Sequence, residues 1–311
     1  MLLRLWIMLI CAWQVCLAAP VTQTAPLVVI VSTDHSAAYI ETAQALIQEL
    51  ERAGVARYSV LQMTASEWRD ARPQPPRVYV TLGAEAADLL ARSVQGAPVL
   101  CALLPRSSFD ALLLRNGRKA SSQLSAIFLD QPAQRQFRLI RLAFPAARRV
   151  GVLWGPEASN ESNVWRAQAQ AEALQLLEAD VSQDDQLFPA LKQVLDGTDL
   201  LLAVPSPQVY NNSTIQNILL ASFRARMPMM AFSPAYVRAG ALLAVYVTPV
   251  QVGVQAAQRA RAVLDGKALP ATGAYSSDFQ ISVNEHVARS LGLSLDAQDL
   301  SRRLRHREGL P

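Results

Sequence analysis

The sequence has few of the residues that hold metal ions or form disulfide bonds. Its 311 residues include three cysteines and three histidines. His35, His286 and His306 stand far apart and have no cysteine or carboxylate partner at the spacing of a metal site, so we expect no bound metal. Cys101 lies in an apolar run, which predicts a buried thiol in a strand. The other two cysteines fall in the N-terminal segment, and a single remaining cysteine forms no internal disulfide.

The excess of positive over negative charge is also small. The chain carries 29 basic and 25 acidic residues, a formal net charge of +4, spread along its length. This bias is too weak to indicate a nucleic-acid partner. Beyond the N-terminal segment no run without charges is long enough to cross a bilayer, so we expect no transmembrane helix there. The apolar content of 51% is enough for two hydrophobic cores.

The usual sequence signatures of catalysis are missing. There is no Gly-x-Ser-x-Gly turn for a nucleophilic serine, no glycine-rich loop that would cradle a phosphate, and no histidine beside a candidate serine. An enzyme needs a nucleophile with its base, a pair of carboxylates, or a bound cofactor. We therefore expect a protein that is not an enzyme and that binds no cofactor.

The N-terminus has the order of a secretory signal peptide. Arg4 precedes an apolar run from Leu5 to Leu17, and Ala18 and Ala19 follow it. The run is too short to span a bilayer comfortably, and cleavage after Ala18 would leave small residues before the cut. We therefore expect residues 1–18 to be removed and the mature chain to reside in the periplasm, with an uncleaved membrane anchor as the alternative.

After this segment, apolar strands alternate with amphipathic helices. Two successive runs of these units predict an α/β protein with two Rossmann-like lobes of parallel sheet. The closing elements have no sheet of their own, so we expect them to return to the two lobes and to form a hinge of several strands. The expected strands are 27–32, 58–63, 78–82, 99–104, 124–128, 149–154, 200–204, 229–232, 241–247 and 279–283, and the expected helices are 39–53, 83–93, 107–115, 133–143, 161–177, 185–195, 212–226, 250–264 and 285–291.

The predicted domains follow from this order. Residues 26–122 and 248–275 form the N-terminal lobe, and residues 123–247 and 276–297 form the C-terminal lobe. Residues 298–311 form a basic tail, which we expect to be mobile. On one helix, Arg135, Arg138 and Arg141 share a face, which is most simply solvated, with a docking patch for a partner protein as the alternative.

Two polar loops directly follow two apolar strands in the second run. Ser206, Tyr210 and Asn211 come after the strand 200–204, and Ser233 and Tyr236 come after the strand 229–232. In an open α/β sheet, small ligands bind at the carboxyl ends of the strands. Hydroxyls, an amide and ring faces suit holding a small molecule more than transforming it.

Four segments carry a resemblance to a known family. They read RVGVLWGPEASNES at 149–162, LLLAVPSPQVYNNSTIQNILLASFRARMPMMAFSPAYVRAGALLAV at 200–245, GVQAAQRARAVLDGKALP at 253–270 and FQISVNEHVARSLGL at 279–293. Together they resemble the ABC transporter substrate-binding proteins of the type I periplasmic-binding fold. More narrowly, they are similar to the members that bind tryptophan and related amino acids. The resemblance implies two lobes that close around a small solute.

The same resemblance implies which residues line the cleft. In the first lobe it points to Ser32, Thr33 and Asp34 after the first strand, and to Gly83 and Ala84 at a helix N-terminus that presents backbone donors to an anion. In the second lobe it points to residues that follow strand ends: Trp154, Gly155, Ser206, Tyr210, Asn211, Ser233 and Tyr236.

Several of these residues also have an interpretation without a ligand. Ser32 or Asp34 suits the cap of the first helix, and Asn211 suits the cap of a later one. Gly83 suits a tight strand-to-helix turn in any case. Trp154 suits packing under the hinge. The sequence leaves these alternatives open.

The implied function is that of an exported monomer that captures an amino acid or a similar compact polar or aromatic solute. The protein would then deliver the solute to an inner-membrane ABC permease. The alternative is a periplasmic ligand-sensing or uptake-accessory protein without a permease of its own. In both cases, closure of the lobes couples solute binding to a partner.

Overall fold

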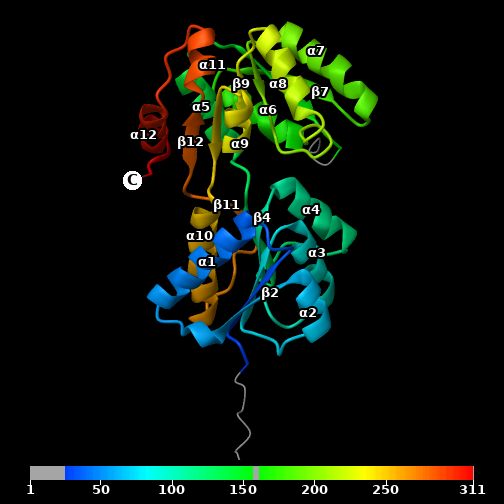
Figure 1. Ribbon diagram of the computed structural model, residues 1–311, viewed down its shortest axis with the longest axis vertical. Coiled ribbons are helices and arrows are strands. Elements are labelled where there is room, and N and C mark those ends of the chain that lie inside the picture. The colour runs from blue at the N-terminus through cyan, green and yellow to red at the C-terminus, as the bar shows by residue number, and fades with distance from the viewer. Residues whose placement is uncertain (1–24, 157–160, 311) are drawn as a thin grey trace, which may run out of the picture.

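Two lobes stacked end to end make up the computed structural model, which describes residues 25–156 and 161–310 (Figure 1). Each lobe is built on a six-stranded sheet with helices on both faces. This confirms the predicted α/β fold with two Rossmann-like lobes. The expected signal peptide, residues 1–18, lies outside the described residues.

The sheet of the first lobe has the strand order β11-β5-β4-β3-β1-β2, and its neighbouring strands are all parallel. Its edge strand β11 comes from near the end of the chain. The helices and strands of this lobe are β1 (Val28–Ser32), α1 (Ala37–Arg52), β2 (Val60–Thr64), α2 (Ala65–Ala71), β3 (Val78–Leu82), α3 (Ala84–Ser93), β4 (Val99–Leu104), α4 (Arg106–Arg115), β5 (Leu124–Phe128), α10 (Pro249–Leu264) and β11 (Ala274–Tyr275).

The sheet of the second lobe has the order β12-β10-β9-β8-β6-β7, and only β12 runs antiparallel to its neighbour. The helices and strands of this lobe are α5 (Ala133–Ala143), β6 (Arg149–Trp154), α6 (Ser162–Ala171), β7 (Gln175–Asp180), α7 (Leu187–Gly197), β8 (Leu200–Leu202), α8 (Ile215–Arg224), β9 (Met229–Ala231), α9 (Pro234–Ala239), β10 (Leu243–Tyr246), β12 (Gln280–Val283), α11 (Glu285–Ser290) and α12 (Ala297–Glu308).

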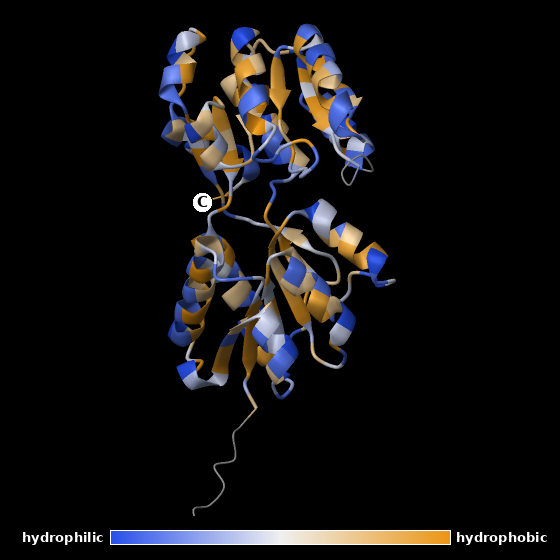
Figure 2. Ribbon diagram, turned by 45° about the vertical axis from the view of Figure 1, so that its right-hand side comes forward, coloured by the Kyte–Doolittle hydropathy of each residue, from blue (hydrophilic) through white to orange (hydrophobic). Residues whose placement is uncertain are grey.

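The first lobe buries apolar residues on both faces of its sheet. Successive residues of a strand point to opposite faces, so Val28 and Ile30 of β1 pack with α1 and α10, whereas Val29 and Val31 pack on the side of α2, α3 and α4. Figure 2 shows the result as hydrophobic strands between helices whose outer residues are hydrophilic. Helix α10 lies close against α1 at Gly253, where a Cβ would be 2.5 Å from the carbonyl oxygen of Thr42.

The second lobe divides its core in the same way. Val150 and Val152 of β6 pack on the side of α5, α6 and α12, whereas Leu153 packs on the side of α7 and α8. On the first of these faces the ring of Trp165 meets the ring of Phe137 edge to face, with centroids 5.8 Å apart. Both faces of the sheet are therefore covered, as parallel strands require.

The prediction of one helix over 161–177 is wrong after Ala171. Helix α6 ends at Ala171, Ala173 adopts a left-handed φ of 55°, and β7 follows as an edge strand paired with β6. Leu, Glu, Gln and Ala favour a helix by intrinsic propensity. Pairing with β6 outweighs that preference, which no local pattern in the sequence records.

The predicted lobe boundary at residue 123 lies one strand too early. Strand β5 pairs with β4 in the first sheet, so the second lobe begins after Phe128. The predicted mobile tail is also wrong, because α12 occupies most of it and buries Leu300 and Leu304 in the second core. Arg135 of α5 is not on a solvated face either: only 5% of it is exposed, and its guanidinium lies 2.7 Å from Glu308 of α12.

Three segments of the described chain connect the lobes: residues 129–132 between β5 and α5, residues 247–248 between β10 and α10, and residues 276–279 between β11 and β12. This confirms the predicted hinge of several strands. Among the described residues, the helices are all too short or too polar to cross a membrane.

Candidate functional site

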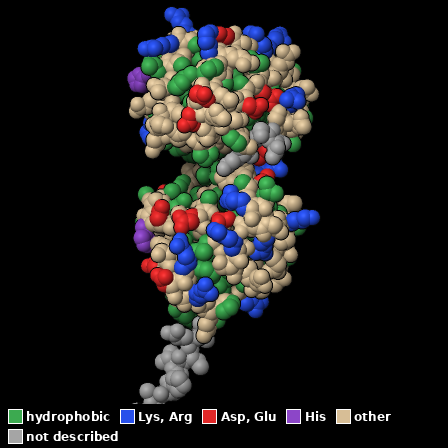
Figure 3. All heavy atoms as spheres, turned by 90° about the vertical axis from the view of Figure 1, so that its right-hand side faces the viewer, with side chains coloured by type: hydrophobic (Ala, Val, Ile, Leu, Met, Phe, Trp, Pro, Cys, Tyr) green, Lys and Arg blue, Asp and Glu red, His purple; other side chains and the backbone are tan. Residues whose placement is uncertain are grey.

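A cavity of about 680 Å³ lies between the two lobes, at the level where the surface narrows in Figure 3. The carboxyl ends of strands from both sheets face it, together with the connecting segments. Its lining is mostly apolar, which suits a solute with an apolar body. The lining residues are Ser36, Ala38, Tyr39, Glu41, Leu103 and Pro105 from the first lobe, Leu129, Asp130, Tyr246, Val247, Thr248 and Pro249 from the connecting segments and their ends, and Pro205, Phe232, Ser233, Pro234 and Arg238 from the second lobe.

The floor of this cavity is held by hydrogen bonds between the connecting segments. Thr248 caps α10: its hydroxyl accepts from the backbone N–H of Gln251 at 3.2 Å, and the Gln251 side chain accepts from the backbone N–H of Thr248 at 2.9 Å. The same Gln251 donates from Nε2 to Asp278 at 2.7 Å, in the third connecting segment. The floor is thus ordered before any solute arrives.

Tyr39 forms the first-lobe wall, and Gly83 makes room for it. Gly83 has a φ of 93°, and a Cβ there would overlap the Tyr39 hydroxyl and lie 2.6 Å from Oγ1 of Thr33. Burial raises the pKa of Tyr39 above its ordinary value, so its phenol stays protonated as a hydrogen-bond donor. The packing of Tyr39 and Thr33 is therefore enough to require glycine at position 83, whether or not a ligand binds there.

The five residues predicted in the first lobe lie beside the cavity rather than among its lining residues. Ser32 is buried, and the Thr33 hydroxyl donates to the carbonyl of Leu82 at 3.2 Å and accepts from the N–H of Ala86 at 3.3 Å. Asp34 accepts from the N–H of Ser36 at 2.7 Å, which orders the start of α1. Gly83 and Ala84 begin α3. Their contact with a solute stays a prediction.

Three aromatic rings pack together in the second-lobe wall and behind it. Phe232 lines the cavity, and its ring meets the rings of Tyr236 and Tyr210 edge to face, with centroids 5.0 and 5.9 Å away. The Tyr236 hydroxyl donates to the backbone carbonyl of Tyr210 at 3.3 Å. Tyr210 is buried, and burial raises the pKa of its phenol. Of the predicted Tyr210, Ser233 and Tyr236, only Ser233 is a lining residue, and its hydroxyl also caps α9.

The remaining predicted residues order the second lobe. Asn211 accepts from the N–H groups of Ser213 and Thr214 at 3.0 and 3.2 Å and donates to the carbonyl of Pro207 at 2.8 Å, so it shapes the loop before α8. Trp154 is buried and donates to Glu178 at 2.8 Å. Gly155 lies so close to the buried Ser206 that a Cβ there would overlap the Ser206 hydroxyl. None of these four predicted residues appears in the cavity lining.

Asp130 is a lining residue that the sequence analysis did not single out. It follows β5 in the first connecting segment, and its Oδ1 accepts from the backbone N–H of Arg106 at 2.9 Å. Burial raises the pKa of the Asp130 carboxyl to about 7, while the Arg106 N–H opposes the shift. Burial likewise raises the pKa of the neighbouring Tyr275 to about 12, and the Asp130 charge adds to that shift.

A signal for these missed residues was present in the sequence. Asp130 stands two residues after a predicted strand, and Tyr246 and Thr248 lie at the end of another, where the strand-end rule places ligands. Tyr39 and Arg238 lie within helices, so no strand-end rule would find them. Their place in the cavity depends on how the helices are set against the sheets.

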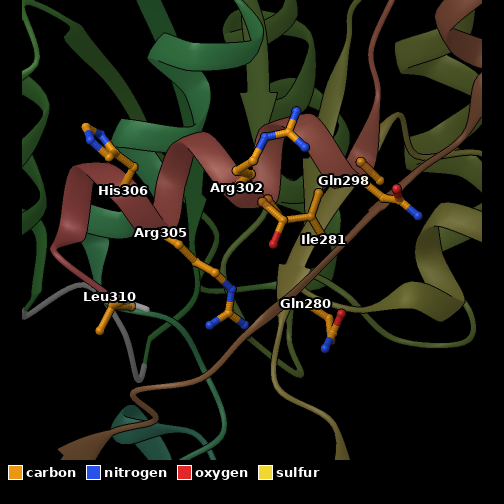
Figure 4. A pocket seen from close by; sticks show the side chains of 9 residues that line it. Gln280, Ile281, Gln298, Arg302, Arg305, His306 and Leu310 are labelled. Atoms are coloured by element: carbon orange, nitrogen blue, oxygen red, sulfur yellow. The ribbon is translucent and has the colours of Figure 1, made fainter.

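A second hollow of about 520 Å³ lies on the second lobe, between α12 and β12 (Figure 4). It is lined by Gln280, Ile281, Ala297, Gln298, Ser301, Arg302, Arg305, His306 and Leu310. Its arginines already have partners: Arg305 pairs with Asp278, and Arg302 lies 2.7 Å from Asp299. Because only one lobe forms it, lobe closure would not enclose a solute there.

The cavity between the lobes is equipped for binding. It offers aromatic faces, hydroxyls and one carboxyl at its floor, and no described residues form a group of three metal-ligating side chains. The thiol of Cys101 is buried within β4, and burial raises its pKa to about 12, which keeps it from acting as a thiolate.

Comparisons with known proteins bear on the family and the fold. Residues 58–303 match the sequence model of the ABC transporter substrate binding protein family. A conserved domain protein from Vibrio cholerae is 19% identical with a TM-score of 0.63, over 90% of this chain and 98% of that one. An open, ligand-free substrate-binding protein with adhesive properties from Clostridium difficile is 16% identical with a TM-score of 0.68, over 88% and 96%.

A third solved structure, an ABC domain from Streptococcus pneumonia in complex with L-Trp, is 16% identical with a TM-score of 0.61, over 88% of this chain and 97% of that one. At these identities the likeness shows the fold alone. No curated protein matches the sequence. Because the family match spans well over half of the chain, this protein belongs to the ABC transporter substrate-binding protein family.

Proposed function

We propose that this protein captures a small solute in the cavity between its lobes, outside the cytoplasm, and delivers it to an ABC-type permease. The observation that carries the proposal is the cavity of about 680 Å³ whose walls come from different lobes and whose floor is the hinge. A solute that contacts Tyr39 on one wall and Phe232 on the other stabilises the arrangement in which the walls are close. Binding energy is thereby converted into lobe closure, which a permease recognises.

The family match and the hinge support this proposal. Three connecting segments permit a change in the angle between the lobes while each six-stranded sheet stays intact. Delivery also requires the mature chain to be on the outer side of the inner membrane, which the predicted signal peptide would provide.

A thermal-shift screen of amino acids, nucleosides, sugars and vitamins tests the proposal, because a solute that binds only the folded protein raises its melting temperature. A compound that raises the melting temperature should lose most of its effect in Phe232→Ala. Phe223→Ala is the matched control, because Phe223 is exposed on α8 and lies outside the cavity. A compound that stabilises Phe232→Ala and the wild type equally would refute the site, and a screen without any binder would count against the function.

A further inference from the structure

Of the charged residues that line the cavity, Asp130 is the one that is partly buried. The cavity has three charged lining residues, Glu41, Asp130 and Arg238, and both Glu41 and Arg238 are exposed. Water and salt screen charges at an exposed rim, whereas a charge in a less polar setting acts strongly on whatever lies next to it. The charge preference of the cavity is therefore decided at Asp130.

The carboxylate of Asp130 forms no direct ion pair with a cation among the described residues, although the Arg106 guanidinium acts on its charge from farther away. Within residues 25–156 and 161–310, the ion pairs of the structure do not include Asp130, and its Oδ1 is held by the backbone N–H of Arg106. The Arg106 guanidinium is engaged elsewhere: its Nε lies 3.4 Å from Asp110 and 4.0 Å from Glu161 of the second lobe. A carboxylate withdrawn from water without a counter-ion is costly.

The surroundings of Asp130 oppose its negative charge. Burial is the largest cause that raises its pKa, to about 7, and the charge of Glu161 acts in the same direction. The Arg106 backbone N–H and guanidinium act against them, and Tyr275 also faces the carboxyl. At neutral pH the side chain is thus poised between two protonation states, and a neighbouring cation would fix the charged one.

We propose that the solute carries a protonated amine and that Asp130 is its counter-ion at the floor of the cavity. This inference rests on the proposed function, because it names the chemical class of the solute that the cavity takes. The rings of Tyr39, Phe232 and Tyr246 line the same cavity, and aromatic faces attract cations. The apolar lining then accommodates the hydrocarbon part of the solute, whereas an anion would meet a like charge at Asp130.

The experiment compares compounds that share an apolar body and differ in one polar group. Phenethylamine, 2-phenylethanol, 3-phenylpropanoic acid and phenylalanine form one such set, and the corresponding indole compounds form a second. They are added to the broad thermal-shift screen, and each compound that binds is then titrated by calorimetry. The variants are Asp130→Asn, which keeps an oxygen to accept the Arg106 N–H, and Glu51→Gln, a matched loss of one carboxylate at an exposed position of α1 outside the cavity.

Compounds with an amine should bind the wild type, and the matched alcohols and acids without one should not. Asp130→Asn should weaken the binding of the amines by about 30-fold or more, because the ammonium loses its counter-ion. Glu51→Gln should change it by less than about threefold, since an exposed charge outside the cavity contributes little.

The pH dependence provides a second readout in the unmodified protein. The amine binds the deprotonated carboxylate, so its affinity should fall as the pH drops below about 7, approaching about tenfold for each pH unit. Asp130→Asn should remove this dependence. If Asp130→Asn does not fold, the wild-type pH profile alone decides the question.

Two results would overturn the inference and leave the proposed function standing. One is a solute without an amine that binds the wild type and Asp130→Asn equally well. The other is an affinity that rises as the pH falls below about 7, which would make the protonated carboxyl the binding form. A screen in which no compound binds would contradict the proposed function itself, and the inference would fall with it.

Discussion

The side-chain amide of Gln251 donates a hydrogen bond of 2.7 Å to Asp278, and this contact joins the first turn of α10 to the third segment that connects the lobes. Gln251 also completes the cap of α10, which begins directly after the second connecting segment. The Arg305 guanidinium pairs with the same Asp278 from α12. Burial opposes the charge of Asp278, but the bonds from Arg305 and Gln251 hold its pKa below the ordinary value. The hinge is therefore restrained by contacts that are polar and few.

Replacing Gln251 should loosen the hinge. Gln251→Ala removes the bond to Asp278 and one half of the cap, and we expect a loss of about 1–2 kcal/mol in the free energy of unfolding. Urea denaturation measures this loss, and small-angle scattering measures the wider range of lobe angles. Gln258→Ala is the control, because Gln258 is exposed on the same helix. Equal stability of the two variants would show that the contact does not restrain the hinge.

The ion pair between Arg135 and Glu308 should hold α12 against the second lobe. The side chains are only 6% and 11% exposed, so Glu308→Ala leaves a buried guanidinium without its carboxylate. We expect a loss of roughly 3 kcal/mol in the free energy of unfolding, measured by urea denaturation. Glu285→Ala breaks an exposed pair with Arg289 and should cost less than about 1 kcal/mol. Similar values for both variants would mean that the Arg135–Glu308 pair does not hold α12 against the lobe.

Gly83→Ala should damage both the first lobe and solute binding. Gly83 and Gly96 share a left-handed φ, at 93° and 91°, but only at Gly83 does a Cβ meet other atoms, Tyr39 and Thr33. The strain from φ, about 1 kcal/mol, is common to both alanine variants, so the difference between them reports the clash. We expect Gly83→Ala to be less stable than Gly96→Ala by at least about 1 kcal/mol. It should also weaken solute binding, because Tyr39 is displaced from the cavity wall.

If Gly83→Ala and Gly96→Ala melt at the same temperature, the close approach of Tyr39 to Gly83 does not exist in solution. Binding that stays unchanged in Gly83→Ala would remove Tyr39 from the site.

The pKa of Asp130 predicts how the solute-free protein responds to pH. The pKa of this carboxyl is about 7 in the folded state and near 3.8 in the unfolded state. At pH values between the two, the folded protein therefore binds more protons at this site than the unfolded chain does. The contribution of Asp130 to stability is therefore largest at acidic pH and is lost as the pH rises from about 4 to about 7. Glu178 acts in the opposite sense. Burial opposes its charge, but bonds from Ser162, Arg166 and Trp154 lower its pKa, so its contribution is lost as the pH falls.

Comparing Asp130→Asn with the wild type isolates the contribution of Asp130. The variant should gain stability relative to the wild type as the pH is raised from about 5 to about 8, by several degrees in melting temperature. A difference between the two melting temperatures that stays constant over this range would show that the pKa of Asp130 is not raised.

The two-lobed fold was predictable because it depends on local periodicity. Strands such as Val99–Leu104 and Leu200–Leu202 are continuous apolar runs, which is typical of parallel strands covered on both faces. Strand β7 was missed because an edge strand of helix-favouring residues carries no such run. Helix α12 was missed because its charge suggested a solvated tail, although Leu300 and Leu304 have the spacing of a buried helical face.

The candidate site was less predictable than the fold. The strand-end rule points to the edge of each sheet at which the cavity lies, and Ser233 lines this cavity, but its contact with a solute stays a prediction. The rule does not say which side chain of a loop turns toward the cavity. Tyr210 turns into the second core and Thr33 bonds within the first lobe, because caps and packing inside each lobe use these groups first. Asp130 also follows a strand end, but it was not identified because a lone carboxylate carries no motif that distinguishes it from other loop residues.

The most direct test of the account is the crystal structure of the protein with a saturating solute from the screen. We predict that the solute lies between Tyr39 and Phe232, with its amine at Asp130 and with the lobes closer together than in the solute-free protein. A solute bound in the hollow between α12 and β12, or on the outer surface of a single lobe, would contradict the account.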